Sequence, residues 1–210
     1  MGNILFHLQF PPPTLPETLV FDMFFESLDG WFQQVWNSAT ATLSANHVQL
    51  HAIASINSRA LLQKSPYYPV VTPTWAKART LKAKVRIVNT TNSGERFRIF
   101  TGNSDAPIGF GFLIENTKLY GRSGNGTLEN IIELEQLPAA PYDLLRNLRA
   151  EFTPGSKVIF YVDDILKGEL TTRLPTGTDG AVLFAWLEAW AINAFTRDLY
   201  VSQFRLTQEV

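Results

Sequence analysis

The clearest fold pattern in the sequence lies between Leu144 and Thr172, which reads LLRNLRAEFTPGSKVIFYVDDILKGELTT. Apolar and polar residues alternate on either side of two short polar segments, Thr153–Ser156 and Asp163–Asp164. Pro fixes one φ and Gly tolerates a positive φ, so Thr-Pro-Gly-Ser has the chemistry of a tight turn. The pattern therefore predicts three consecutive strands joined by two reversals. The middle strand, Val158–Val162, is apolar on both faces and is predicted to lie deep in a sandwich.

The same stretch resembles a known superfamily. RAEFTPGSKVIFYVDDILKGEL is similar to the meander of concanavalin A-like lectin and glucanase domains. FDMFFESLDGW (residues 21–31) resembles their opening strand, and DLYVSQFRLTQ (residues 198–208) resembles the last strand, which pairs with the opening one. The resemblance spans residues 20–208 and implies an all-β, antiparallel jelly-roll β-sandwich. The superfamily includes lectins, glycosidases, adhesion modules and virion proteins, so the fold by itself does not carry a function.

The composition is that of a globular domain with a large core. Of the 210 residues 45% are hydrophobic, including 15 Phe and 5 Trp. We expect one jelly-roll domain over residues 17–210, large enough to bury roughly 70% of its unfolded surface. The net charge of −1 favours neither nucleic acid nor an anionic membrane as a partner. The chain has no cysteine and needs no oxidising compartment, and no apolar run reaches the ~18 residues of a membrane-spanning helix.

Residues 1–16 form a segment of their own, in which a short apolar run precedes Pro11-Pro12-Pro13. Three prolines favour an extended spacer. The run either packs as a strand on its own sandwich or serves as an arm that adds a strand to a neighbouring subunit. The residues available for such self-association are Ile4, Leu5, Phe6, Leu8 and Phe10. The segment lacks the basic start and long apolar stretch of a signal peptide, so we expect synthesis in the cytoplasm.

The strand predicted over Leu81–Val88 directs one apolar and one basic face to opposite sides. Lys82, Lys84 and Arg86 point outward, which is compatible with an anion-binding face. The alternative is a solvated convex sheet whose cations have acidic partners on neighbouring strands and whose lysines protect an edge. The near-zero net charge and the absence of interleaved aromatic residues favour this alternative.

Two patterns are candidates for catalysis and for metal binding. Glu133 and Glu135 are predicted to lie on one strand face ~6.5–7 Å apart, a separation typical of glycosidases. The resemblance implies a Glu-x-Asp-x-x-Glu catalytic pattern, of which the middle Asp and the distal acid are missing here. Asn103 and Asp105 offer oxygen ligands for Ca²⁺ in the loop at residues 103–107, without the carboxylates of a strong site. We therefore expect no obligatory cofactor.

The segment AVLFAWLEAWAINAF (residues 181–195) has the most unusual composition. Its length and its Ala and Leu content permit a buried helix, whereas its neighbours and the superfamily's order favour a strand. As a strand it places Glu188 between Trp186 and Trp190 on one face. Such a face either binds a saccharide, through aromatic planes and a carboxylate, or belongs to a core or subunit interface. Farther on, the apolar phase slips after Val201, which predicts a β-bulge near Ser202–Gln203.

The sequence thus favours a non-enzymatic structural or binding module that self-associates through its N-terminal arm. The absence of a complete catalytic set and the proline-hinged arm support this hypothesis, which extends to a component of a virion or similar particle. The alternative is a carbohydrate-active protein, either a lectin that uses Trp186, Glu188 and Trp190 or a divergent glycoside hydrolase that uses Glu133 and Glu135. Neither alternative calls for a nucleic acid or a membrane.

Overall fold

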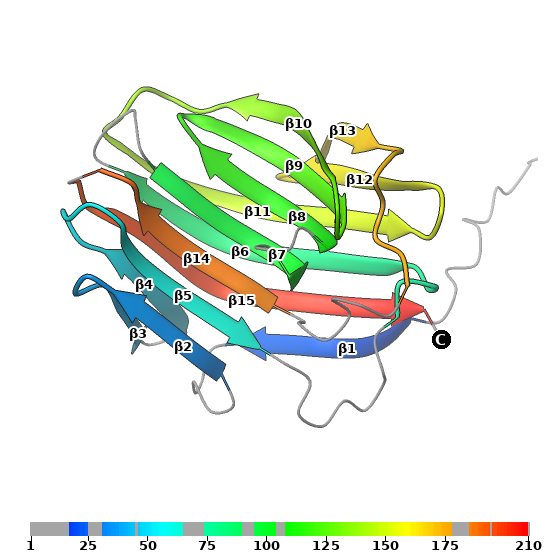
Figure 1. The fold of residues 1–210 in the computed structure, drawn as a ribbon, viewed down its shortest axis with the longest axis horizontal. Helices are drawn as coiled ribbons and strands as arrows, with labels where there is room; N and C mark the ends of the chain where they lie inside the picture. The colour runs from blue at the N-terminus through cyan, green and yellow to red at the C-terminus, as the bar shows by residue number, and fades with distance from the viewer. Residues whose placement is uncertain are drawn as a thin grey trace, which may run out of the picture.

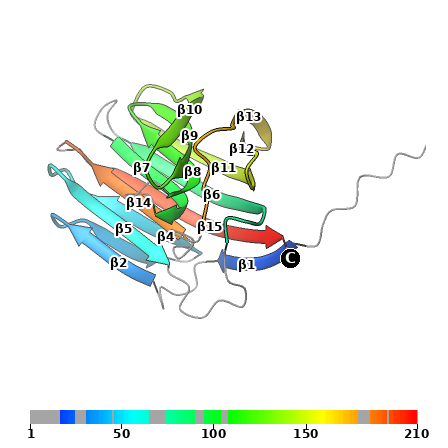
Figure 2. The same cartoon turned by 45° about the vertical axis from the view of Figure 1, so that its right-hand side comes forward.

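The structure is a computed structural model that describes residues 17–24 (backbone only), 31–44, 46–64, 74–89, 95–103, 108–177, 185–193 and 195–209. These residues form strands, turns and bends without a helix, so none of them could span a membrane as a helix. The strands build two antiparallel sheets that pack face to face (Figure 1). A second view, turned by 45°, shows the two layers from the side (Figure 2). The all-β sandwich predicted from the sequence is confirmed.

One sheet has eight strands in the order β13-β12-β11-β6-β15-β4-β3, with β1 also paired to β15. Its strands are β1 (Glu17–Phe24), β3 (Thr40–Ser44), β4 (His47–Ala52), β6 (Arg79–Asn89), β11 (Tyr142–Thr153), β12 (Lys157–Val162), β13 (Ile165–Leu170) and β15 (Arg197–Glu209). The other sheet has seven strands in the order β10-β9-β8-β7-β14-β5-β2. Its strands are β2 (Trp31–Trp36), β5 (Ser58–Lys64), β7 (Glu95–Asn103), β8 (Ile108–Glu115), β9 (Lys118–Asn125), β10 (Glu129–Gln136) and β14 (Ala185–Ala191).

The meander β11-β12-β13 confirms the three predicted strands and both turns. Asp163 and Asp164 take the positive φ values of the second reversal, 51° and 63°. The prediction that β12 is buried on both faces was wrong. Val158, Phe160 and Val162 enter the core, whereas Ile159 and Tyr161 remain partly exposed, because a two-layer sandwich covers only one face of each sheet.

The last strand, β15, lies inside the eight-stranded sheet and pairs with the opening strand, as predicted. β15 pairs with the opening strand β1 along Gln203–Glu209 and with β4 along Arg197–Val201. Its register against β6 shifts between Val201 and Gln203, which confirms the predicted bulge. The bulge is needed because the apolar phase changes there, so Val201 and Phe204 both reach the core.

The core lies between the inner faces of the two sheets. Trp75 and Phe152 meet edge to face with centroids 5.9 Å apart, and Phe110 stacks on Phe152 at 5.5 Å. Each such fully buried aromatic side chain contributes about 1.5–3 kcal/mol. β6 sends Leu81, Ala83, Val85 and Ile87 into this core, as its alternation predicted. However, β6 lies in the middle of its sheet, between β11 and β15, so its lysines protect no edge and that part of the interpretation was wrong.

Residues 185–191 settle the choice between strand and helix. They form β14, which lies between β5 and β7 inside the seven-stranded sheet. Ala185, Leu187, Ala189 and Ala191 are buried in the core. Trp186, Glu188 and Trp190 alternate with them and therefore lie on the outer face of the sheet.

Candidate functional site: the outer face of the seven-stranded sheet

Strand register assembles aromatic and arginine side chains into one row on this face. Trp36 lies opposite Arg59, Arg59 opposite Trp190, and Trp190 opposite Arg96. The Arg59 guanidinium lies 4.9 Å from the Trp36 ring centroid and 5.3 Å from that of Trp190, and the Arg96 guanidinium lies 5.0 Å from Trp190. Cations over indole rings at these distances attract the π electrons. We call Trp36, Arg59, Trp190 and Arg96 the Trp–Arg ladder.

Arg96, the last residue of the ladder, contacts the carboxylate of Glu115 on β8. Glu115 lies opposite Arg96 and accepts a hydrogen bond from Arg96 Nε at 3.1 Å. Both side chains remain 25% exposed. The guanidinium is therefore held in place while its edge and the carboxylate stay accessible to solvent.

Glu188 forms a buried ion cluster with Arg59 and Arg98 and thereby fixes the Arg59 side chain of the ladder. Glu188 has no exposed surface; its carboxylate pairs with Arg59 and, at 3.2 Å, with Arg98 Nη1. The indole N–H of Trp186 donates to the same carboxylate at 3.1 Å. Trp186 itself is 2% exposed and packs with Leu61 and Phe100 in a small second apolar cluster.

This burial changes the role of the residues chosen from the sequence. The structure brings Trp186, Glu188 and Trp190 together on one face, as the strand interpretation required, but only Trp190 is partly exposed. The carboxylate of Glu188 is fully engaged with protein donors. Trp186 and Glu188 therefore position the ladder, and the interpretation of Glu188 as an acceptor for ligand hydroxyls was wrong.

Next to the ladder, strands β7 and β8 approach each other closely at a glycine. Gly111 on β8 lies between Phe100 on β7 and Arg122 on β9 in the register. A Cβ at Gly111 would lie 2.3 Å from the Ile99 carbonyl oxygen, so only glycine fits. The Arg122 guanidinium lies 5.3 Å from the Phe100 ring centroid and pairs with Glu129. Burial lowers the pKa of Arg122 below its ordinary value, although the charge of Glu129 and its hydrogen bond to Arg122 act in the opposite direction.

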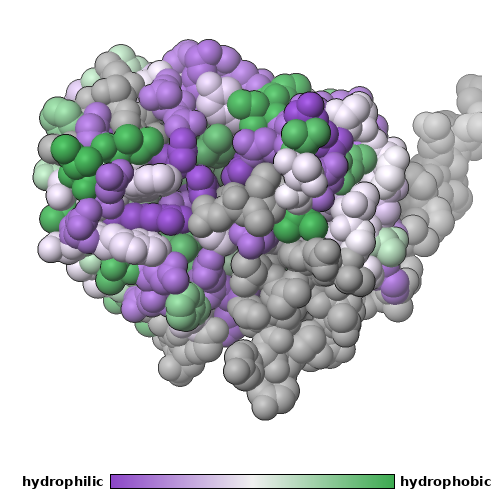
Figure 3. Space-filling model, in the orientation of Figure 1, coloured by the Kyte–Doolittle hydropathy of each residue, from purple (hydrophilic) through white to green (hydrophobic). Residues whose placement is uncertain are grey.

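The most accessible aromatic groups of the face lie on the edge strand β2. Phe32, Gln34 and Trp36 alternate on its outer side, and Phe32 is 56% and Trp36 38% exposed. Figure 3 views this face and shows hydrophilic and hydrophobic side chains interleaved on it. Flat rings beside amide, guanidinium and carboxylate groups can bind the C–H faces and the hydroxyls of a sugar. Sequence reasoning missed Phe32, Trp36, Arg59 and Arg96, because only the pairing of distant strands brings them together.

The candidate catalytic carboxylates have separate ionic partners. Glu133 accepts a hydrogen bond from Lys118 Nζ at 2.6 Å, and Glu135 accepts one from Arg146 Nη2 at 2.6 Å. A register shift lies between the two residues, so the uniform alternation assumed from the sequence does not hold there. Each carboxylate is neutralised by its own cation, which differs from an acid and base that face one cleft.

The remaining sequence candidates fall largely outside the described residues. Asn103 ends β7, but Asp105 lies outside the described ranges, as do Ile4, Leu5, Phe6, Leu8 and Phe10. Within those ranges no three His, Asp or Glu side chains gather as a metal site would need. The calcium and arm predictions stay predictions.

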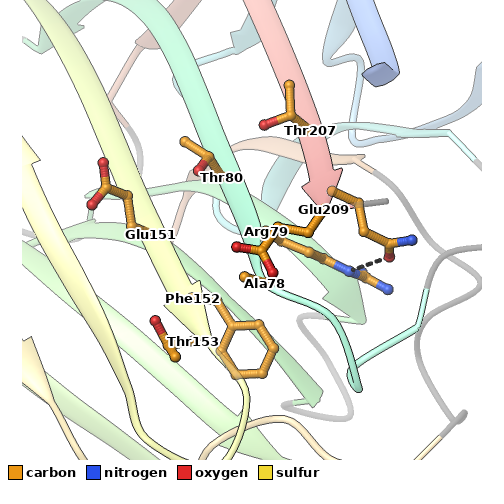
Figure 4. Close-up of a pocket in the computed structure, with 9 residues that line it drawn as sticks. Ala78, Arg79, Thr80, Glu151, Phe152, Thr153, Thr207 and Glu209 are labelled. Atoms are coloured by element: carbon orange, nitrogen blue, oxygen red, sulfur yellow. Dashed lines mark hydrogen bonds between the residues drawn. The ribbon is translucent and has the colours of Figure 1, made fainter. Parts of the chain in front are cut away.

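A polar hollow of about 250 Å³ lies on the other sheet, at the ends of β6, β11 and β15 (Figure 4). Thr80, Thr153 and Thr207 line it, between Glu151 and Glu209. The side chain of Arg79 is buried beside it, 4.1 Å from the Trp75 ring centroid, with Nε donating to Gln208 Oε1 at 3.2 Å.

Burial lowers the pKa of Arg79 to about 9. Its Nε also donates to the Thr74 carbonyl at 3.1 Å, so Arg79 joins β6 to β15 and to the segment before β6. We assign Arg79 a structural role.

Comparison with solved structures identifies proteins of similar fold. No family model and no curated protein matches the chain. An endo-β-1,4-glucuronan lyase from the fungus Trichoderma reesei superposes with a TM-score of 0.63 at 12% identity, over 90% of this chain and 95% of that one. The carbohydrate recognition domain of Emp47p superposes with a TM-score of 0.60 at 13% identity, over 91% and 95% of the two chains.

A third solved structure is the binding domain of botulinum neurotoxin DC in complex with SialylT. Its TM-score is 0.58 at 12% identity, and the match covers 84% of this chain and 42% of that one. At these identities the likeness concerns the fold alone. The jelly-roll architecture of the lectin and glucanase superfamily, which the sequence resembles, is confirmed.

Proposed function

We propose that this concanavalin A-like sandwich is a non-enzymatic module that binds saccharides on the outer face of its seven-stranded sheet. The observation that carries the proposal is the Trp–Arg ladder, which holds an exposed Trp36 and a partly exposed Trp190 beside polar groups. The ligand would stack on Trp36 and Phe32 along β2, with Gln34 between them in reach of its hydroxyls, and only a longer saccharide that crosses β5 and β14 would reach Arg96 and Glu115. The names of the Emp47p and neurotoxin domains, a carbohydrate recognition domain and a binding domain, agree with this role.

The side chains of the Trp–Arg ladder are fixed in place before a ligand binds. Arg59 is 16% exposed and is fixed from below by Glu188, which has no exposed surface. Its guanidinium lies near both Trp36 and Trp190, so both rings are held before a ligand arrives. A preorganised surface loses little conformational entropy on binding, which favours affinity for a ligand that makes few contacts.

The experiment is a glycan screen followed by calorimetric titration with the tightest-binding oligosaccharide. We expect Trp36→Ala to weaken that saccharide's affinity about tenfold, since loss of one aromatic stacking contact is worth about 1.4 kcal/mol. Ile165→Ala is the matched control, because Ile165 is 60% exposed and lies on β13 of the other sheet. Unchanged affinity in Trp36→Ala, with the fold intact, would contradict the proposed surface.

The N-terminal segment supports a second proposal, that the module is a component of a larger particle or polymer. Residues 1–16 combine an apolar run with three prolines and directly precede β1, which starts at Glu17. A segment of this composition is suited to exchange between subunits. The two proposals are compatible, because the arm and the Trp–Arg ladder are separate parts of the chain.

A further inference from the structure

The outer face of the eight-stranded sheet carries a basic surface that the proposed saccharide platform does not use. Thr80, Lys82, Lys84 and Arg86 point outward along β6, and Lys82, Lys84 and Arg86 are exposed. Three hollows follow one another beside this strand, at Thr80, at Lys82 and Lys84, and at Arg86. The middle one, lined by both lysines, measures about 290 Å³, and we call it the β6 hollow.

Strand register places no acidic residue directly opposite either lysine. Lys82 lies opposite Arg149 on β11 and opposite Arg205 on β15, so three cations occupy one row on adjacent strands about 4.8 Å apart. Lys84 lies opposite Asn147 and Gln203. The two lysine side chains make no hydrogen bond or ion pair with another described residue. Like charges directly opposite one another destabilise a sheet.

Neighbouring cations on the same sheet do have carboxylate partners. Arg86 pairs with Asp143, Arg149 with Glu151 and Lys157 with Glu169. The expectation of acidic cross-strand partners therefore holds for Arg86 but was wrong for Lys82 and Lys84. Because β6 is a central strand, edge protection does not account for them either. Their charge is available to an external anion.

The rest of the lining points to a saccharide as the carrier of that anion. Asn147 and Gln203 contribute amide groups to the β6 hollow, and Asp164 contributes a carboxylate that lies 3.9 Å from Arg149 Nε. The side chain of Gln203 makes no hydrogen bond with another described residue. The tyrosine rings beside the hollow are only partly exposed, unlike Phe32 and Trp36 on the other sheet. The Arg149 guanidinium lies 3.7 Å from the Tyr161 ring centroid, and that of Arg86 lies 5.1 Å from Tyr200. Single-stranded nucleic acids need exposed ring faces on which their bases stack, which Tyr161 and Tyr200 do not offer.

We propose that the β6 hollow binds an acidic saccharide, whose carboxylate or sulfate group lies between the ammonium groups of Lys82 and Lys84. Arg149 lines the same hollow but is paired with Glu151 and Asp164, so the two lysines supply the positive charge, and Asn147 and Gln203 hydrogen-bond the hydroxyls. This site lies on the opposite side of the sandwich from the Trp–Arg ladder, and it does not depend on saccharide binding there.

The test is titration of the full chain at low salt with a heparin oligosaccharide and an oligogalacturonate of equal length. The first carries sulfates and the second carboxylates only, so the two probes identify which group is bound. We expect the double variant Lys82→Gln/Lys84→Gln to lose affinity about tenfold or more, because two charge-assisted contacts are removed. The matched control, Lys77→Gln/Lys167→Gln, changes the net charge equally outside the hollow and should bind as the unmodified chain does.

The possible outcomes separate clearly. Binding of either probe that the double variant loses and the control keeps supports the site. Three results would overturn it: no binding of either probe at low salt, equal loss in both double variants, or a single-stranded DNA oligonucleotide that binds more tightly through the same lysines. Trp36→Ala should leave binding of the acidic probes unchanged, so a failure of the ladder proposal is distinguishable. Because Lys82 and Lys84 are exposed, thermal melting should show an intact fold.

Discussion

Glu188 is a carboxylate with no exposed surface, held between Arg59 and Arg98, whose side chains are 16% and 10% exposed. Taking three charges out of water costs free energy, which their mutual contacts and the Trp186 N–H offset. Removing only the carboxylate leaves two cations close together in a poorly solvated site. The cluster is therefore sensitive to loss of its single anion.

We expect Glu188→Ala to lower the free energy of unfolding by about 3–5 kcal/mol, the cost of breaking a buried ion pair by removing one partner. Glu188→Gln retains the shape and one acceptor oxygen and should lose less. Denaturant titration measures both. Glu133→Ala serves as the control, because that carboxylate is 43% exposed and pairs with an exposed Lys118. If Glu188→Ala and Glu133→Ala unfolded at the same denaturant concentration, the supporting role of Glu188 would be refuted.

Asp143 forms an ion pair with Arg86 on β6, and its titration can be used to detect that pair. Arg86 Nε donates to Asp143 Oδ1 at 2.7 Å, and this hydrogen bond, together with the charge of Arg86, lowers the pKa of Asp143 below its ordinary value of 3.8. A carboxyl group with a lowered folded-state pKa adds stability above pH 3.8. That contribution is lost as the pH falls through the lowered value.

We expect Arg86→Gln to raise the pKa of Asp143 toward its ordinary value, as measured by the NMR titration of its carboxyl carbon. Lys84→Gln on the same strand is the control. It removes a positive charge but no contact to Asp143, and should leave the titration close to that of the unmodified chain. The same pH midpoint in the unmodified chain and Arg86→Gln would mean that the pair does not form in solution.

At the level of elements, β8 approaches β7 too closely for a side chain at either of its glycines, Gly109 or Gly111. A side chain at Gly111 would meet backbone atoms of β7, with its Cβ 2.3 Å from Ile99 O and 2.7 Å from Phe100 Cα. Backbone atoms of a central strand cannot move aside without breaking ladder hydrogen bonds. The close approach also leaves room for Arg122 to reach the Phe100 ring across β8.

We expect Gly111→Ala to lower the free energy of unfolding by about 3 kcal/mol or more, as overpacking against backbone requires. Gly155→Ala is the comparison, because a Cβ there meets nothing within 4 Å and only its φ of +63° is unfavourable. Its expected cost is about 1 kcal/mol. Equal stability of the two variants in denaturant would show that β7 and β8 are not in close contact.

At the scale of the whole molecule, the sequence-based arm proposal concerns assembly. We expect the full chain to form a defined oligomer, and a chain that starts at Pro16 to be monomeric, because the apolar residues that would bridge subunits are absent from it. Native mass spectrometry or light scattering measures both. If both forms are monomers of equal compactness, the segment completes its own sandwich and the particle proposal fails.

Elements whose pattern is local could be predicted from neighbouring residues alone. The Leu144–Thr172 meander, the alternation along β6 and the phase slip at Val201 each follow from neighbours in the chain, and the structure has all three. For residues 185–191, resemblance and context favoured a strand, but only the structure settled the choice, because their apolar composition fits a helix equally well. Turn residues and alternation act within a few positions, so they can be read without knowing the partner strands.

Which side chains are buried, and which of them meet, depends on how distant strands pair. β14 alone cannot show that Glu188 lies between Arg59 and Arg98, because those arginines come from β5 and β7. The ladder and the cation row at Lys82 have the same origin, since residues far apart in the chain become neighbours through register. A strand pattern fixes which side of the sheet a residue faces, but its partners depend on strand order, which is set by how two whole sheets close around one core.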